Sequence, residues 1–226
     1  MISILYSLIY KLLYFLTKGI RLKGFVYRSR VLMGKGNHVK SIGRFVRSKL
    51  TIQGKNNIVE IKGSVCTTYI HIEGDCCEIV IEDGVEIYGK EILVRGDHAK
   101  IFVGKNTRIN SGCRLICQGN HNSIFIASDC LFSNGVNIWN SDTHTIYDFE
   151  KNIINLSRPV VIGRHVWFGS NCAVLKGVSI GEDSIIGMHA VVTKSVPHNS
   201  IVAGNPAKVI KSRISWDKAY IKDVSL

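Results

Sequence analysis

The sequence predicts an all-β fold in the form of a parallel β-helix, a solenoid of short strands, and two repeats of different length carry this prediction. From residue 162 onward an aliphatic or aromatic residue recurs at every sixth position: Ile162, Phe168, Val174, Ile180, Ile186 and Val192. Apolar residues recur about every 3.6 positions in an α-helix and every second position in an ordinary strand, so a period of six fits neither. A fixed period of this kind indicates stacked structural repeats.

The middle of the chain carries a longer and looser repeat. The copies LTIQGKNNIVEIKG, IHIEGDCCEIVIEDG, ILVRGDHAKIFVG and LICQGNHNSIFIA begin at Leu50, Ile70, Ile92 and Leu115. Each copy contains two short strand patterns joined by a turn, and the turn glycines are 20, 22 and 23 residues apart: Gly54, Gly74, Gly96 and Gly119. We interpret this distance as one coil, with Gly, Asn and Asp at corners that need a positive φ. Since one coil cannot bury its inward face alone, neighbouring coils must stack.

The two ends of a solenoid need caps. Residues 1–30 begin with an apolar stretch of about 15 residues, shorter than the ~20 that span a bilayer, and show no convincing signal peptide. We expect them to form a helical, basic N-terminal cap. Residues 31–211 then form the β-helix domain, and residues 212–226, with Trp216 and Tyr220, a short C-terminal helix.

The net charge of +12 lies almost entirely at the N-terminus, because residues 1–50 hold eleven Lys or Arg and no Asp or Glu. Such a segment can meet nucleic acid, an anionic membrane or an acidic glycan. No nucleic-acid-binding motif accompanies it, so we expect no nucleic-acid partner. Peripheral contact of residues 1–30 with an anionic membrane and simple capping of the solenoid both stay open.

The cysteine pattern bears on the compartment. There are seven cysteines, an odd number, and none forms a C-x-x-C motif. This pattern favours free thiols in a reducing compartment. We therefore expect a cytoplasmic protein, with a peripheral position at the inner face of the membrane as an extension of that prediction.

The regular repeat stops at Trp139 and resumes near Val160, so residues 139–159 form a polar insertion of about 20 residues. A long loop inside an otherwise regular fold is usually functional. We therefore expect residues that carry out the chemistry of the protein to lie in this segment.

The C-terminal third resembles the left-handed β-helix (hexapeptide-repeat) acetyltransferases, in particular bacterial capsule and lipopolysaccharide O-acetyltransferases. The segments VWFGSN, LKGVSIG, VVTKSVP and VAGNPAKVI occur between residues 159 and 211 in the order typical of that family. The resemblance implies a left-handed crossover, which is an exception to the right-handed rule. It also implies acetyl-CoA as the acetyl donor and a homotrimer with active sites between subunits.

By the same resemblance, His144 in NSDTHTIYD is the catalytic base. An imidazole that titrates near neutral pH can take the proton of an attacking hydroxyl group. Asp142 lies two residues earlier, where it either orients the imidazole or forms a turn. Trp167 lines the active site by resemblance, although packing at an interface is its alternative role.

The resemblance also assigns the donor site. The backbone N–H of Ser170 would stabilise the oxyanion of the tetrahedral intermediate, so Ser170→Ala should have a mild effect. The other positions expected to bind the cofactor are Gly169, Gly187, Met188, Thr193, Lys194, Lys208 and Lys211, the last two as phosphate ligands. Asn110 is a candidate for contact with the acceptor sugar.

Two other classes of protein share this kind of fold. Zinc-dependent γ-type carbonic anhydrases need three histidines, and the other seven histidines of this chain show no such spacing, so we expect no metal. His38, His98 and His121 follow Gly-Asn or Gly-Asp pairs and are expected to be turn residues. A β-helix that serves only binding or assembly is the non-enzymatic alternative.

These observations favour an acetyl-CoA-dependent O-acetyltransferase that acts on a hydroxyl group of a bacterial surface polysaccharide or its sugar precursor. A serine acetyltransferase would need a larger helical N-terminal domain. An N-acetyltransferase for a nucleotide-linked amino sugar and an antibiotic acetyltransferase stay open.

Overall fold

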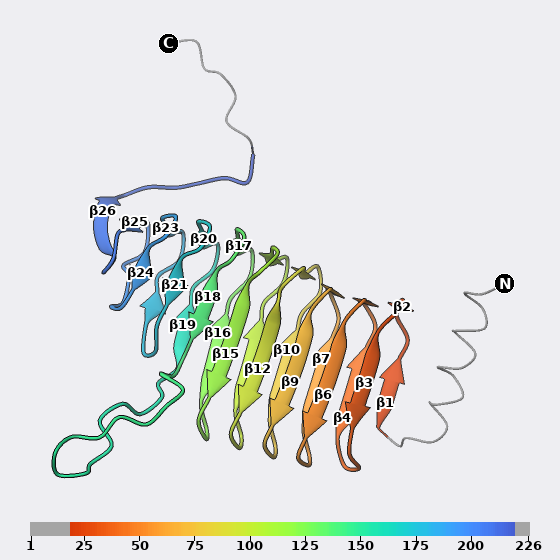
Figure 1. Ribbon diagram of the computed structural model, residues 1–226. Coiled ribbons are helices and arrows are strands. Elements are labelled where there is room, and N and C mark those ends of the chain that lie inside the picture. Colours follow the sequence, from red (N-terminus) through yellow and green to blue (C-terminus); the bar gives the residue numbers. More distant parts are fainter. Residues whose placement is uncertain (1–18, 220–226) are drawn as a thin grey trace.

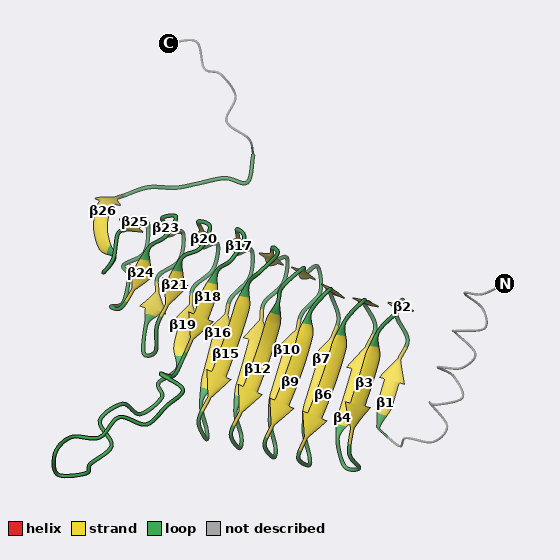
Figure 2. Ribbon diagram, viewed as in Figure 1, coloured by secondary structure: helices red, strands yellow, loops and turns green. Residues whose placement is uncertain are grey.

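The computed structural model describes residues 19–219, which form a stack of short coils with three strands in each complete coil. The strands lie side by side in three sheets that run the length of the stack (Figure 1), and their pairing is parallel except for the last two strands of one sheet. Residues 19–219 contain strands and loops and no helix (Figure 2). The predicted all-β solenoid is confirmed.

Each sheet collects one strand from each coil. Sheet A consists of β1 (Ile20–Leu22), β4 (His38–Ser41), β7 (Ile58–Ile61), β10 (Glu78–Ile81), β13 (Lys100–Val103), β16 (Ser123–Ile126), β19 (Val160–Ile162) and β22 (Ser179–Ile180). Sheet B consists of β2 (Val26–Tyr27), β5 (Arg44–Val46), β8 (Ser64–Cys66), β11 (Glu86–Ile87), β14 (Arg108–Ile109), β17 (Leu131–Phe132), β20 (Trp167–Phe168), β23 (Ile185–Ile186), β25 (Ser200–Ala203) and β26 (Lys208–Ser212). Sheet C consists of β3 (Arg30–Met33), β6 (Lys49–Gln53), β9 (Tyr69–Glu73), β12 (Glu91–Arg95), β15 (Arg114–Gln118), β18 (Asn137–Trp139), β21 (Ala173–Val174) and β24 (Val191–Val192).

The core is a set of columns of apolar side chains inside the stack. One column in sheet A joins five buried residues that are register partners from coil to coil: Val59, Ile79, Ile101, Ile124 and Val160. In sheet B, the rings of Phe132 and Phe168 stack on each other, with their centroids 4.3 Å apart. Alternation of buried and outward-facing residues along each strand follows from the pleat of the backbone.

Coil lengths follow the two sequence repeats. In sheet C, Lys49 pairs with Tyr69, Tyr69 with Glu91 and Glu91 with Arg114, so coils in this region repeat every 20 to 23 residues. Ala173 pairs with Val191, 18 residues later, which is three hexapeptides. The predicted turn positions of His98 and His121 agree with their φ angles of 55° and 53°. His38 instead begins β4.

The N-terminal cap was expected to reach residue 30, and this prediction is wrong for residues 20–30. These residues form β1, β2 and the start of β3 in the first coil. Gly24 shows why the coil continues: a Cβ there would lie 1.8 Å from the carbonyl oxygen of Gly43, so the two turns stack directly. Residues 1–18 of the predicted cap lie outside the described residues.

The C-terminal helix is also wrong as far as the structure describes it. Ser212 ends β26, which pairs antiparallel with β25, and residues 213–219 are irregular. Tertiary contacts hold this segment, because the Trp216 indole donates to the carbonyl oxygen of His165 at 2.8 Å. Tyr220 and the residues after it lie outside the described part. Among residues 19–219, no helix has the length and apolar character needed to cross a membrane.

Candidate active site

The insertion occupies residues 140–159, between β18 in sheet C and β19 in sheet A, and it projects from the stack as a long loop (Figure 1). We call this edge, where sheet C passes to sheet A, the C–A corner. An isolated antiparallel bridge joins Tyr147 to Ile153, so the loop doubles back as an irregular hairpin. Its base is closed by the N–H of Arg158, which donates to the carbonyl oxygen of Asn140 at 2.9 Å.

His144 lies in a tight turn of this loop. Its backbone N–H donates to the carbonyl oxygen of Asp142 at 2.8 Å, and Thr143 between them has a φ of 69°. A hydrogen bond over two residues with a positive φ at the centre is the rare form of γ-turn. Strained turns of this kind persist only where the surroundings fix them, and they cluster at functional sites. The turn therefore presents the exposed His144 side chain in a defined place.

Asp142 binds two other groups instead of the His144 ring. Its carboxylate accepts hydrogen bonds from the ammonium group of Lys176 and from Nδ2 of Asn155, the latter at 3.1 Å. The Lys176 ammonium, followed by the Asn155 amide, holds the pKa of the Asp142 carboxyl below its usual range. No hydrogen bond in residues 19–219 joins this carboxylate to the imidazole, so the orienting role of Asp142 stays a prediction.

Sequence reasoning missed two residues that fix the His144 turn. Asn155 donates to the carbonyl oxygen of His144 at 2.7 Å, and Lys176 donates to the carbonyl oxygen of Asn155 at 3.0 Å. With Asp142, they form a bracket of three side chains at the C–A corner. Strand register offers a signal for Lys176: Asn137 pairs with Ala173, so Lys176 stands one coil above Asn140, where the insertion begins.

A hollow of about 280 Å³ lies between the insertion loop and the ends of β12 and β15. His144 lines it together with Arg95, Gln118, Gly119, Ser141, Thr143, Thr145, Ile153, Asn155, Leu156 and Ser157. Hydroxyl and amide side chains predominate in this lining. Most small-molecule sites are lined mainly by apolar side chains with a few polar groups. This hollow is more polar, with Ile153 and Leu156 as its apolar side chains.

A second group of predicted residues lies along the edge where sheet B passes to sheet C, which we call the B–C corner. Successive turns stack there, since the N–H of Asn110 donates to Phe132 O, that of Gly169 to Ile186 O and that of Gly187 to Val202 O. A Cβ at Gly169 would lie 2.6 Å from the backbone nitrogen of Met188, so the turns are in close contact. Asn110, Gly169, Ser170, Gly187 and Met188 thus share one corner.

At this corner the N–H of Ser170 makes no hydrogen bond within residues 19–219, while its carbonyl oxygen accepts from His189 N at 3.0 Å. The Asn110 side chain accepts from Nε of Arg108 at 3.2 Å. Met188 is exposed. A free N–H, a neighbouring amide and an open surface are compatible with the predicted roles.

Trp167 lies on β20, just before the B–C corner, and 38% of it is exposed. Its ring contacts Trp216 at a centroid distance of 5.8 Å, and Trp216 stacks on His165 at 4.1 Å. The C-terminal segment therefore packs against a predicted site residue. Sequence reasoning did not anticipate this contact, because it depends on residues about 50 positions apart.

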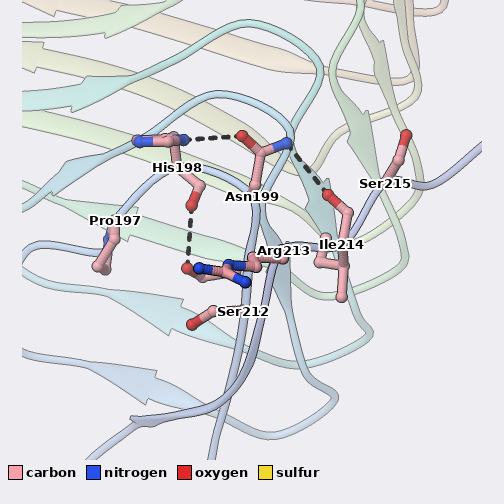
Figure 3. Close-up of a pocket in the computed structure, with 8 residues that line it drawn as sticks. Pro197, His198, Asn199, Ser212, Arg213, Ile214 and Ser215 are labelled. Carbon is pink, nitrogen blue, oxygen red and sulfur yellow. Dashed lines mark hydrogen bonds between the residues drawn. The ribbon is translucent and has the colours of Figure 1, made fainter.

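The remaining predicted cofactor residues are exposed and separate. Thr193 and Lys194 follow β24 at the C–A corner, and Lys208 and Lys211 lie on β26. A hollow of about 590 Å³ lies between the segment before β25 and the chain after β26 (Figure 3). His198 and Asn199 bond there at 2.7 Å, and Asn199 donates to the carbonyl oxygen of Ile214 at 3.1 Å. None of the predicted site residues lines this hollow.

The described chain thus places the predicted catalytic residues at two different corners, apart from the four exposed cofactor residues on and near β24 and β26. The C–A corner holds Asp142 and His144, whereas the B–C corner holds Trp167, Ser170 and their neighbours. Within residues 19–219, neither a hydrogen bond nor a shared hollow joins His144 to Trp167 or Ser170. No group of three or more His, Cys, Asp or Glu in this part of the chain could hold a metal ion.

All seven cysteines are free thiols in the structure. Cys172 lies inside the stack, and burial raises the pKa of its thiol to about 12. A neutral, buried thiol packs as a small apolar group and does not act as a nucleophile.

Comparisons with known proteins decide the family. The profile described as bacterial transferase hexapeptide (six repeats) matches residues 159–194. A polysialic acid O-acetyltransferase of Neisseria meningitidis is 34% identical over 175 residues, which cover 76% of this chain and 80% of that protein. The chain belongs to the hexapeptide-repeat acetyltransferase family.

Other members of the acetyltransferase family agree with this assignment. A polysialic acid O-acetyltransferase of Escherichia coli O1:K1 is 34% identical over 145 residues, 62% of this chain, although the chain spans only 46% of that protein's length. The crystal structure of the polySia-specific acetyltransferase NeuO matches with a TM-score of 0.71 and 28% identity, covering 92% of this chain and 90% of that one. The β-helix of this family is left-handed, as the sequence resemblance implied.

Proposed function

We propose that the protein transfers an acetyl group from acetyl-CoA to a hydroxyl group of a bacterial surface polysaccharide or its sugar precursor, with His144 as the general base. The observation that carries this proposal is the placement of His144, which a tight turn holds at the edge of a hollow lined by hydroxyl and amide groups. Names of the relatives support the substrate class, since two of them are polysialic acid O-acetyltransferases.

In the proposed reaction, the imidazole of His144 takes the proton of the acceptor hydroxyl as its oxygen attacks the thioester carbonyl carbon. A new C–O bond forms and the carbonyl oxygen becomes an oxyanion. The C–S bond then breaks, the electron pair leaves with sulfur, and the imidazolium returns the proton to the CoA thiolate. The products are an acetate ester and free CoA thiol, so no group of the protein changes covalently.

The B–C corner would serve the donor in this scheme. We assign the N–H of Ser170 to the oxyanion, because it has no acceptor within the described chain. Gly169, Gly187 and Met188 would line the pantetheine path, with Thr193, Lys194, Lys208 and Lys211 nearer the nucleotide. All four of the latter are exposed, so each is accessible to a ligand.

We further propose a homotrimer in which one protomer's His144 meets the B–C corner of its neighbour. Two observations support an assembly. The two predicted groups lie at different corners of a single chain, and the insertion loop leaves six apolar side chains exposed: Ile146, Tyr147, Phe149, Ile153, Ile154 and Leu156. An uncovered apolar surface of this kind marks a site of association.

Peripheral contact with an anionic membrane through residues 1–30 belongs to the same proposal. In the described part of this segment, Arg21, Lys23, Arg28 and Arg30 accompany the exposed Phe25. Basic and aromatic side chains together favour the surface of anionic lipid. Flotation with anionic liposomes at low salt tests this part, and protein that stays unbound would contradict it.

The function itself is tested by release of CoA thiol from acetyl-CoA against a panel of acceptors: polysialic acid, a neutral polysaccharide, a nucleotide-linked amino sugar and an aminoglycoside. We expect turnover with a polysaccharide and a loss of about 10²- to 10⁴-fold in His144→Ala. His98→Ala is the matched control, because His98 is a turn residue stacked on His121. Turnover only with the amino sugar or the antibiotic would replace the proposed acceptor, and full activity of His144→Ala would refute the assigned base.

A further inference from the structure

We infer that the hollow beside His144 binds an acidic sugar and that Arg95 is the residue that recognises its carboxylate. This inference rests on the proposed function and adds the residue that selects the acceptor. Three observations carry it: the charge of the lining, the free donors of Arg95 and the contacts that hold Arg95 in place.

The charge of the lining favours an anion. Arg95 is the one Lys, Arg, Asp or Glu residue among the residues around the hollow, all of which belong to the described chain. The other polar groups are hydroxyls, amides and the His144 imidazole. A sugar that carries both hydroxyl groups and one carboxylate matches this set, because hydroxyls pair with the amides and the carboxylate with the guanidinium.

Arg95 keeps most of its donors for a ligand. It lies at the end of β12, and its Nε donates to Oε2 of Glu73 at 2.5 Å. Its two terminal nitrogens make no hydrogen bond within residues 19–219. A guanidinium offers a planar fork that suits a carboxylate, which an ammonium group does not.

Glu73 supports Arg95 from the neighbouring coil. Its second oxygen, Oε1, lies 2.6 Å from Nε2 of His71, whose ring stacks against Tyr69 at a centroid distance of 5.7 Å. The Arg95 hydrogen bond, with a smaller contribution from His71, lowers the pKa of Glu73 to about 2. The carboxylate is therefore ionised at neutral pH and holds the guanidinium at the edge of the hollow. A side chain fixed in this way loses less entropy when a ligand binds.

Hydrogen bonds also fix the backbone of the neighbouring strand end, next to Arg95. Gln118 is the register partner of Arg95 on the next coil, and its backbone N–H donates to Oδ1 of Asn140 at 2.7 Å. The Nδ2 group of Asn140 donates back to the carbonyl oxygen of Gln118 at 3.0 Å. Arg95 therefore lies beside a strand end that these two hydrogen bonds tie to Asn140, and His144 of the insertion loop lines the same hollow.

The test compares acceptors that differ only in charge. Oligomers of sialic, glucuronic and galacturonic acid are each used in native form and after reduction of the carboxyl group to an alcohol. We expect the wild-type protein to favour one native oligomer over its reduced form by at least tenfold in kcat/KM. In Arg95→Met this preference should fall by about tenfold or more, toward equal use of the two forms, as expected for loss of a charged hydrogen bond, and Arg95→Lys should be intermediate.

Arg114→Met is the matched control. Arg114 lies on the next strand of sheet C, pairs with Glu91 at 3.6 Å much as Arg95 pairs with Glu73, and does not line the hollow. It should keep the wild-type preference. Circular dichroism and melting temperature confirm that each variant is folded before its preference is compared.

Three results would overturn the inference: equal use of native and reduced oligomers by the wild type, an unchanged preference in Arg95→Met, or a raised KM for acetyl-CoA in Arg95→Met, which would mean that Arg95 serves a donor phosphate. If no acceptor is acetylated, the proposed function is wrong, but the binding of acidic sugars by Arg95 can still be tested. Saturation-transfer NMR without acetyl-CoA then measures binding of the native oligomers. Binding that is lost in Arg95→Met sustains the inference, and no binding by the wild type refutes it.

Discussion

The stack of coils and the insertion loop obey different rules. In the stack, inward side chains are buried in columns and neighbouring backbones pair in register. In residues 140–159, apolar side chains face solvent, and Phe149 is 103% exposed. Order in the loop comes from polar contacts at its base, above all the bracket of Asp142, Asn155 and Lys176.

This difference shows where stability and chemistry lie. The stack buries its inward-facing apolar side chains within one chain. The loop carries the predicted base, is held by one lysine from the next coil, and has apolar side chains that residues 19–219 leave exposed. Variants in the two regions should therefore affect different measurements.

The largest expected effect is on the stack. Phe132→Ala should lower the free energy of unfolding by about 3–5 kcal/mol, because it removes a ring that packs on Phe168 across the coils that flank the insertion. Urea denaturation measures the change. Phe125→Ala is the control, since Phe125 faces outward and is 42% exposed, and it should cost less than about 1.5 kcal/mol. Equal losses in both variants would mean that the core is not continuous past the loop.

The next effect concerns assembly. Phe149→Asp should leave the melting temperature of the monomer unchanged but weaken self-association by about 10- to 100-fold. The reason is that burial of an aromatic side chain in an interface contributes about 1.5–3 kcal/mol to the free energy of association. Sedimentation velocity over a range of concentrations measures it, with Glu150→Gln as a neighbouring control. A wild-type protein that is monomeric throughout would contradict the trimer.

A smaller effect is expected from the bracket. Lys176→Met should reduce kcat about tenfold, because a misplaced base loses its near-attack geometry, and should change stability by less than about 1 kcal/mol. A double-mutant cycle with Asp142→Asn tests whether the two side chains act together. Lys100→Met, which breaks an exposed pair with Glu78, is the control. If the two single losses in kcat simply add in the double variant, the side chains of Lys176 and Asp142 act independently, which would contradict the bracket.

The smallest effect is the pH dependence of an ion pair on the outer face of the stack. The folded pKa of Glu73 is about 2, below its ordinary value of 4.5, so its contribution to stability is present above pH 4.5 and is lost as the pH falls toward 2. The difference in urea midpoint between wild type and Glu73→Gln should therefore shrink over this range. A constant difference from pH 6 to pH 3 would be inconsistent with the Arg95 contact.

The hexapeptide coils could be predicted from sequence because each corner is specified by neighbouring residues. The 18-residue spacing of Ala173 and Val191 follows directly from that period. The first coil was missed because its alternation is weak, and the one clear signal, Gly24 and Gly43 in the same stacked turn, depends on a contact 19 residues away. The C-terminal helix was wrong for the same reason, since β26 is specified by pairing with β25 and not by a local pattern.

The site divides in the same way. The resemblance and the insertion indicated His144, and the structure places it beside a hollow. Lys176 and Asn155 could not be identified as site residues from the sequence, because lysine and asparagine are common at turns. Only the stacking of the coils shows that these two side chains contact the His144 turn. The proposed meeting of His144 with the B–C corner of a neighbouring protomer could not be predicted from a single chain, since His144 and Trp167 lie at different corners.

Strand β26 has a consequence for growth of the solenoid. A parallel β-helix ends in open strand edges, and such edges invite another copy to add on without limit. By turning back antiparallel on β25, β26 covers the last edge of sheet B with a strand of opposite direction and with exposed basic residues. We therefore expect the C-terminal hairpin to hinder the end-to-end addition of a second copy at this edge of sheet B.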